Sequence, residues 1–188
     1  EPAVEDLGDF STAGGATGPL SRPRGMAVDD DGNIVVAGFA WISGTAYDMI
    51  LARYCYDPIS STWALDTVEA GDWPGLYSSI ALDAADRPII SYYHSGTQDL
   101  KLAYHDGTAW QKDVVDSEGN MGKYASLALD GEGQRHISYH DESQDRLKYA
   151  TTVPPTLYHY AAQHLEEARG TSAAPGWELA QLGPEVQP

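Results

Sequence analysis

The 188-residue chain is 42% hydrophobic and 21% charged, a balance that is typical of a folded protein and excludes a disordered one. Its 28 acidic and 11 basic residues give a formal net charge of −17, which argues against nucleic acid and anionic membrane surfaces as partners. A single cysteine, Cys55, excludes an internal disulfide and a Cys-rich metal centre, and no apolar stretch has the length that insertion into a membrane as a helix requires.

Residues 1–24 are expected to hold an N-terminal strand and a linker rather than a complete repeat. The segment Val4–Phe10, VEDLGDF, is similar to Leu65–Trp73, LDTVEAGDW, which lies near the end of the first repeat. An isolated strand needs a host sheet, and we predict that this one pairs with another chain. Its apolar contacts would come from Val4, Leu7 and Phe10.

One unit is written three times, over residues 25–71, 72–119 and 120–188. Each copy has four short runs rich in Ile, Val, Leu and Tyr, separated by Gly, Asp, Asn and Ser, which is the pattern of strands joined by tight turns. An Asp ends the first strand, a second Asp opens the third and a Trp opens the fourth. These landmarks are Asp29, Asp83 and Asp130, then Asp48, Asp99 and Asp145, then Trp63, Trp110 and Trp177. The sequence therefore predicts an all-β fold of three four-stranded antiparallel units of the β-propeller blade type.

The second and third units resemble the extracellular propeller repeats of bacteria, whose pattern reads SIALD, ISYYD, LKYA and GxxW. Ser79–His94 with Leu100–Tyr104, and Ser126–Asp141 with Leu147–Ala150, carry this resemblance. The first unit, with MAVDDDGNIVVAGFA and DMILARY, is similar to the delta-60 or SBBP-type repeats of large bacterial surface proteins. The resemblance covers roughly residues 25–149 and implies an architecture rather than an activity.

The third unit departs from the pattern at residues 153–176, where an insert replaces the expected hairpin. Pro154 and Pro155 precede an amphipathic run and Gly170 follows it, which predicts a short helix. This helix either covers a sheet edge or binds a partner. The residues that would serve assembly are Leu157, Tyr160 and His164.

The sequence contains little evidence of a metal-binding or catalytic motif. Asp29, Asp31 and Asn33 could offer oxygen ligands to calcium, but the later copies keep only the first Asp, which favours a plain hairpin turn. The six histidines form no HExxH motif, and no nucleophile elbow or phosphate-binding loop is present. We therefore expect no cofactor, no metal and no catalytic residues.

Aromatic and polar residues at strand ends are the ligand-binding candidates. They are Trp41, Tyr93, His94, His140 and Asp141. Tyr and Trp side chains could stack on sugars, but they also commonly fill the interfaces between blades, and both interpretations stay open.

Three blades are too few to close a propeller, which typically needs four to eight, so we expect the chain to associate with copies of itself or with another subunit. The first hypothesis is a non-catalytic, extracytoplasmic interaction or structural subunit, secreted or at the cell surface, because the sequence opens at Glu1 and a signal peptide is presumed removed. The alternative is a lectin-like carbohydrate-binding module that is closed by oligomerisation. A glycoside hydrolase is the third hypothesis.

Overall fold

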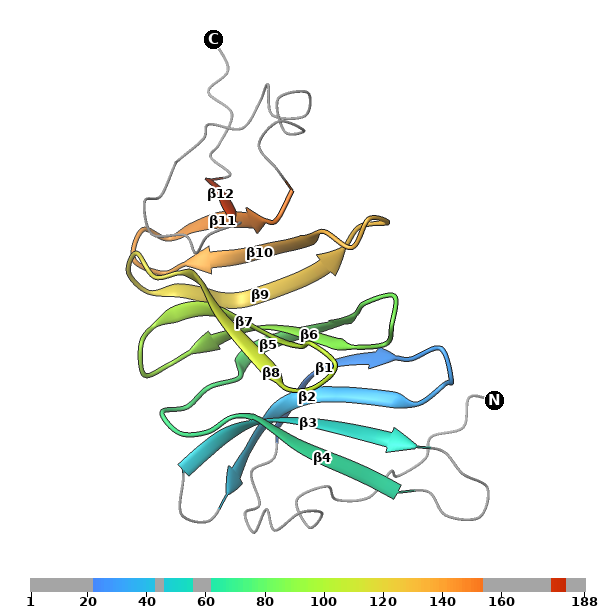
Figure 1. Ribbon diagram of the computed structural model, residues 1–188. Coiled ribbons are helices and arrows are strands. Elements are labelled where there is room, and N and C mark those ends of the chain that lie inside the picture. The colour runs from blue at the N-terminus through green and yellow to red at the C-terminus, as the bar shows by residue number, and fades with distance from the viewer. Residues whose placement is uncertain (1–21, 43–45, 56–61, 154–176, 182–188) are drawn as a thin grey trace, which may run out of the picture.

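The computed structural model describes residues 22–42, 46–55, 62–153 and 177–181, which form twelve strands and, within these ranges, no helix (Figure 1). Sheet 1 contains β1 (Arg22–Val28), β2 (Ile34–Ile42), β3 (Ala46–Cys55) and β4 (Thr62–Glu69). Sheet 2 contains β5 (Leu76–Leu82), β6 (Pro88–His94), β7 (Asp99–His105) and β8 (Trp110–Asp116). Sheet 3 contains β9 (Met121–Leu129), β10 (Arg135–Asp141), β11 (Arg146–Thr151) and β12 (Glu178–Gln181).

Each sheet is an antiparallel meander whose strands lie side by side in chain order. The predicted all-β fold of three four-stranded antiparallel units is therefore confirmed. The N-terminal strand with Val4, Leu7 and Phe10, and the helix with Leu157, Tyr160 and His164, fall outside the described residues and stay predictions.

The first hairpin of every sheet is closed by the Asp that ends its first strand. The carboxylate of Asp29 accepts a hydrogen bond of 2.7 Å from the backbone N–H of Asn33, and Asp130 accepts one of 2.8 Å from Gln134. Asp83 makes the same bond to Arg87, at 3.0 Å. A side-chain acceptor that bonds back to the turn holds a tight hairpin, so this repeated Asp has a structural role.

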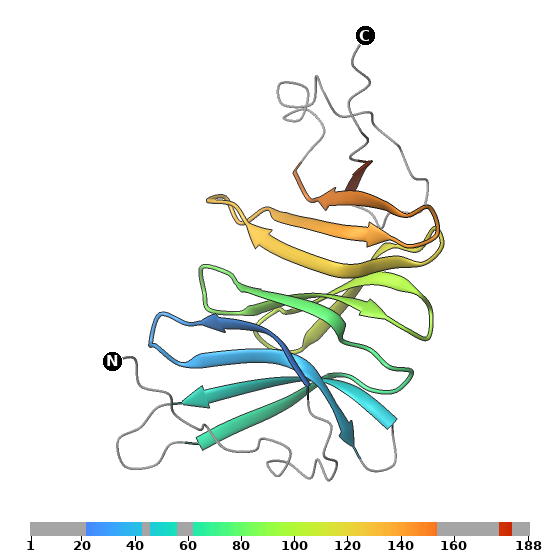
Figure 2. The ribbon, with the colours of Figure 1, turned by 180° about the vertical axis from the view of Figure 1, so that it is seen from behind.

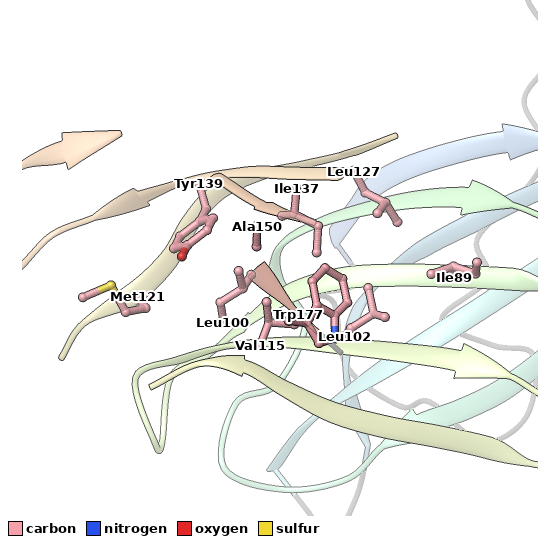
Figure 3. Close-up of a cluster of buried hydrophobic side chains, with 10 residues drawn as sticks. All are labelled: Ile89, Leu100, Leu102, Val115, Met121, Leu127, Ile137, Tyr139, Ala150 and Trp177. Carbon is pink, nitrogen blue, oxygen red and sulfur yellow. The ribbon is translucent and has the colours of Figure 1, made fainter. Parts of the chain in front are cut away.

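The three sheets stack face to face in the order of the chain (Figures 1 and 2). Their first strands, β1, β5 and β9, are spatial neighbours. A buried apolar cluster joins sheets 1 and 2, formed by Val35, Ala37, Met49, Leu51, Val68, Ile80, Ile90, Tyr92 and Ala103. A second cluster joins sheets 2 and 3 (Figure 3), formed by Ile89, Leu100, Leu102, Val115, Met121, Leu127, Ile137, Tyr139, Ala150 and Trp177. Burial of these side chains is what holds the sheets together.

The three landmark tryptophans occupy one structural position, as the repeat predicted. Trp63 pairs with Tyr54 and Trp110 with His105 across the outer two strands, and Trp177 directly precedes β12. Trp177 is buried between sheets 2 and 3, and Trp110 packs on the cluster between sheets 1 and 2. Each of these two side chains therefore packs toward the preceding sheet.

Two of the Asp landmarks were placed wrongly, because Asp48 is the third residue of β3 and does not open it. Asp145 does not open the third strand of sheet 3 but lies in the preceding turn, at a φ of 49°. Arg146 takes the register position that Asp48 and Asp99 hold in the other sheets. The turn needs a residue that tolerates the left-handed region, and Asp is among those that do so.

Two glycines allow each sheet to approach the one before it. Gly75 directly precedes β5 and Gly122 is the second residue of β9, at the same distance before Asp83 and Asp130, and both have positive φ angles, of 84° and 101°. A Cβ on Gly75 would lie 2.8 Å from Met49 Cγ, and a Cβ on Gly122 would lie 2.8 Å from the Leu100 Cα. Glycine is required at both points because of the backbone angle and the lack of space.

Candidate functional site

Aromatic side chains gather where the β2–β3 hairpin of sheet 1 meets the connection to sheet 2. Trp41 is the next-to-last residue of β2, Tyr47 is the second residue of β3 and is buried, and Trp73 lies in the connection; we call these three the tryptophan cluster. The ring centroids of Tyr47 and Trp73 are 4.2 Å apart, and those of Trp41 and Tyr47 are 5.3 Å apart. Trp41 is 41% exposed and Trp73 is 47% exposed, so the cluster presents apolar ring surface to solvent.

The connection that carries Trp73 is strained and fixed in place. Asp72 and Trp73 are consecutive and have φ angles of 55° and 60°, a region that costs about 1–3 kcal/mol for residues other than glycine. The backbone oxygens of Asp72 and Trp73 accept hydrogen bonds from the N–H groups of Gly96 and Ser95, at 3.0 and 3.2 Å. These bonds hold Trp73 in a conformation that its backbone does not favour intrinsically.

A second set of side chains crosses all three sheets beside their first strands. This tyrosine row consists of Arg24, Tyr77, Tyr124 and His140. The Arg24 guanidinium lies 5.9 Å from the Tyr77 ring, Tyr77 lies 4.6 Å from Tyr124, and Tyr124 lies 6.2 Å from His140. Desolvation, together with the hydrogen bond to Tyr124, raises the pKa of the Tyr77 phenol above 10, so this hydroxyl stays protonated at physiological pH.

The row and the cluster are joined through Phe39. The Arg24 guanidinium lies 5.5 Å from the Phe39 ring, and the Phe39 ring lies 5.6 Å from Tyr47. Arg24 therefore sits beside both sets, as an exposed cation with several hydrogen-bond donors.

Polar groups lie at the other end of the row. Glu142 pairs with Lys123 and accepts a hydrogen bond from the Asn120 amide, and the Lys123 ammonium lies 5.6 Å from the Tyr93 ring. Asn120 Oδ1 and His140 Nδ1 are buried atoms without a hydrogen-bond partner in the part of the chain that the structure describes. Buried polar atoms are normally paired, so these two mark an incompletely satisfied region.

The five predicted ligand-binding residues separate into two groups. Trp41 belongs to the tryptophan cluster, His140 to the tyrosine row, and Tyr93 is buried 6.2 Å from Tyr77. His94 and Asp141 are instead buried at the ends of β6 and β10, next to the β6–β7 and β10–β11 turns. The structure thus brings three of the predicted residues to one edge of the stack.

The other two residues stabilise their turns. His94 Nδ1 accepts a hydrogen bond of 3.2 Å from the backbone N–H of Thr97. The Asp141 carboxylate accepts bonds from the N–H of Gln144 at 3.1 Å and from Arg146 Nε at 3.2 Å. Sequence reasoning could not separate these capping roles from ligand binding, because both use polar residues at a strand end.

His94 should make the fold sensitive to mild acid. Burial lowers the pKa of its imidazole below the ordinary value of 6.5, so the unfolded chain takes up a proton before the folded one does. Stability is therefore expected to fall as the pH drops below about 6.5 and through the lower folded pKa. In His94→Asn, which keeps an acceptor for Thr97, urea midpoints at several pH values should show a flatter decline. An equally steep decline in the variant would contradict this origin.

The calcium candidates form a hairpin turn. The Asp29 carboxylate is bound by the Asn33 backbone N–H, the Asn33 amide and Arg53. Burial acts to raise the pKa of Asp29, but these bonds outweigh it and lower the pKa below 3.8. Across residues 22–42, 46–55, 62–153 and 177–181, no group of three or more His, Cys, Asp or Glu side chains could hold a metal ion.

Two ionic trios link consecutive sheets, one of them buried and the other partly buried. The Tyr139 hydroxyl donates a hydrogen bond of 2.6 Å to Asp116, the last residue of β8, and Lys148 also bonds this carboxylate. Tyr92, Lys101 and Glu69 repeat the arrangement one sheet earlier. There the hydroxyl bond is 2.6 Å and the ion pair 3.2 Å.

Burial and the neighbouring carboxylates raise the pKa of both tyrosines far above 10, so each keeps the proton that it donates. Because the trio recurs at both sheet interfaces, we assign it to the architecture rather than to catalysis.

No helix in the described ranges is long and apolar enough to cross a membrane. No family model and no curated protein matches the chain.

Two solved structures are similar to this chain. A protein of unknown function from Dyadobacter fermentans aligns with a TM-score of 0.52 and 15% identity over 70% of this chain and 46% of its own, so this chain spans just under half of that protein. A fucose lectin from Kordia zhangzhouensis, solved with methyl-fucoside, aligns with a TM-score of 0.47 and 20% identity over 68% of this chain and 90% of its own. The first similarity supports the fold.

Proposed function

We propose that the chain is a non-catalytic carbohydrate-binding module of a β-propeller type and that its ligand stacks on the tryptophan cluster. The observation that carries this proposal is the conformation of Trp73, whose side chain is 47% exposed although its backbone is held at a φ of 60°. Folding gains little from an exposed indole at a strained position. Strain that the surrounding structure maintains in this way is common at ligand-binding sites.

The chemistry of the cluster matches a sugar. A pyranose ring has an apolar face of C–H groups and a rim of hydroxyls, so it needs an aromatic platform with hydrogen-bonding groups beside it. Trp41 and Trp73 supply the platform, the buried Tyr47 packs against both rings, and the hydrogen bonds of the connection fix the backbone of Trp73. Arg24, which lies on the Phe39 ring beside Tyr47, is an exposed donor, and Asp72, the residue before Trp73, is an exposed acceptor.

Charge favours a neutral ligand over an ionic one. The net charge of −17 repels anions, while the exposed guanidinium of Arg24 beside the aromatic rings disfavours a cation. A neutral saccharide meets neither penalty. Its hydroxyls can also accept a hydrogen bond from a donor such as Arg24 and donate one to an acceptor such as Asp72.

A binding role also suits the carboxylate at the far end of the tyrosine row better than hydrolysis does. Glu142 is bonded to both Lys123 and Asn120. Glycoside hydrolysis uses two carboxyl groups placed on either side of the scissile bond, one of which gives up a proton. A carboxylate that is occupied by two donors orients its neighbours instead. An extracytoplasmic location, secreted or at a cell surface, fits such a module and forms part of the proposal.

The test is binding to an array of glycans, with free monosaccharides as competitors. Trp73→Ala and Trp41→Ala should each weaken binding about 30-fold, the loss expected for an aromatic hot spot worth about 2 kcal/mol. Val114→Ala, which removes an exposed apolar side chain on β8, is the matched control and should bind as the wild type does. Unchanged binding in both Trp variants, or release of free sugar from the array, would contradict the proposal.

A further inference from the structure

The two outermost faces of the stack each expose apolar side chains at positions that are buried elsewhere in the chain. Met26 and Val28 on β1 are 66% and 58% exposed. Counted from the Asp that follows each first strand, they correspond to Ile80 and Leu82 in sheet 2, which pack against sheet 1. Met26 and Val28 therefore stand where the repeat places contacts to a preceding sheet.

Sheet 3 also exposes side chains that are covered in the other sheets, on the face that points away from sheet 2. Leu147 on β11 is 46% exposed, whereas Met49 and Leu100, at the same register position, are fully buried by the following sheet. Tyr124 is 68% exposed, whereas its equivalent Tyr77 is covered by Tyr124 itself. Both groups stand where the repeat places contacts to a next sheet.

The outer face of sheet 1 is apolar even at the positions that carry charge elsewhere. The residues that correspond to Tyr92 and Lys101 are Gly38 and Ile50, so sheet 1 lacks the hydroxyl and the ammonium that bind a carboxylate from a neighbour. On this face Met26 and Val28 are exposed, Val36 is partly buried and Ile50 is buried, so the side chains that these positions offer to a partner are apolar rather than charged.

We propose that sheet 3 of one copy packs on sheet 1 of a second copy, in the same way as consecutive sheets pack within the chain. This joint extends an interface that already occurs twice, between sheets 1 and 2 and between sheets 2 and 3. It would cover all four exposed groups at once, two from each partner. The inference does not depend on carbohydrate binding.

The geometry of the joint sets the number of copies. A head-to-tail contact gives a ring where the rotation closes and a filament where it does not. Two copies bring six sheets together, within the four to eight that closed propellers typically contain. The product is therefore a closed dimer with two identical joints, in which each copy donates sheet 3 and receives on sheet 1.

The dimer is tested by sedimentation equilibrium and light scattering over a range of protein concentrations. The wild type should reach twice the chain mass of 20.3 kDa and no more. Because both copies carry a charge of −17, dimerisation should strengthen as the salt concentration rises from roughly 50 to 500 mM. The double variant Met26→Lys with Val28→Lys should be monomeric, and so should Leu147→Lys. Val114→Lys, on the outer strand of sheet 2, should still dimerise.

Mixing the two monomeric variants identifies the direction of the joint. Sheet 3 of the Met26→Lys, Val28→Lys chain and sheet 1 of the Leu147→Lys chain are both intact, so one joint can form and a heterodimer should appear. A face that paired with itself would give no such rescue. A wild type that stays at 20.3 kDa at every concentration, or a mass that keeps growing with concentration, would overturn the inference. Glycan binding by the monomeric variants is measured separately. Failure of the dimer proposal can then be distinguished from failure of the carbohydrate-binding proposal.

Discussion

Gly122→Ala is expected to destabilise the protein by about 3 kcal/mol or more. The new Cβ would lie 2.8 Å from both Cα and Cβ of Leu100, inside the interface between sheets 2 and 3, where backbone cannot easily move away. Overpacking of a buried contact costs about 1–3 kcal/mol, and a left-handed backbone adds about 1–2 kcal/mol for alanine. The two effects act together because one residue carries both. Equilibrium unfolding in urea measures the loss.

Gly107→Ala is the matched control for this substitution. Gly107 has nearly the same φ, 105° against 101°, but a Cβ there would meet nothing within 4 Å. Its variant should therefore show the backbone cost without the packing cost. Equal losses in the two variants would mean that the close approach of the sheets at Gly122 contributes no stability.

Asp116→Ala is expected to cost about 3–5 kcal/mol, the loss typical of removing one partner from a buried ion pair. The substitution leaves the Lys148 ammonium and the Tyr139 hydroxyl buried without their shared acceptor. A buried cation without a partner must lose its proton or find water, and both routes favour unfolding. Thermal and urea unfolding should both show the loss.

A triple variant separates the cost of breaking this trio from the net contribution of the trio itself. Asp116→Leu, Lys148→Met and Tyr139→Phe together replace all polar members with apolar side chains of similar size. Such exchanges are often neutral or stabilising, so the triple variant should be far more stable than Asp116→Ala. A triple variant as unstable as the single one would show that the trio stabilises the interface between sheets 2 and 3 directly.

The strands and turns could be predicted from the sequence because their signals are local. Alternation of apolar and polar residues sets the faces of a strand, and Asp or Gly at fixed places sets the hairpins. The predicted equivalence of the three Trp positions is also confirmed, because a residue that recurs at a regular spacing occupies the same site in each unit. Asp145 was placed wrongly because the turn and the strand meet in an unbroken run of polar residues from Asp141 to Arg146, in which residue type does not show where the strand starts.

The tryptophan cluster and the tyrosine row could not be predicted in full. Their geometry depends on backbone conformations that cannot be inferred from residue type. Tyr77 and Tyr124 have φ angles of 52° and 54°, although Tyr is a typical strand residue. Register shifts in the pairing of β5 with β6 and of β9 with β10 accompany them. The available signal was a repeated Gly-x-Tyr spacing, at Gly75 and Gly122.

The ionic trios were missed for a different reason, since their members lie far apart in sequence. Tyr92 and Tyr139 each follow their carboxylate by 23 positions, and Lys101 and Lys148 each follow it by 32. Such contacts join neighbouring repeats, so the residue pattern within a single repeat does not reveal them. Two identical spacings in consecutive units were the signal that could have found them.

The central place of sheet 2 has a consequence for how the amide protons of the molecule exchange with solvent. Sheet 2 is covered by sheet 1 on one face and by sheet 3 on the other, and all seven residues of β6 are buried. In a linear array, each unit is stabilised by its neighbours, and the terminal units open first at the lowest free energy. In the monomeric Met26→Lys, Val28→Lys variant, which is such a linear array, deuterium should therefore enter β1 and β11 early and β6 last, with exchange from β6 requiring the opening that unfolds the whole stack.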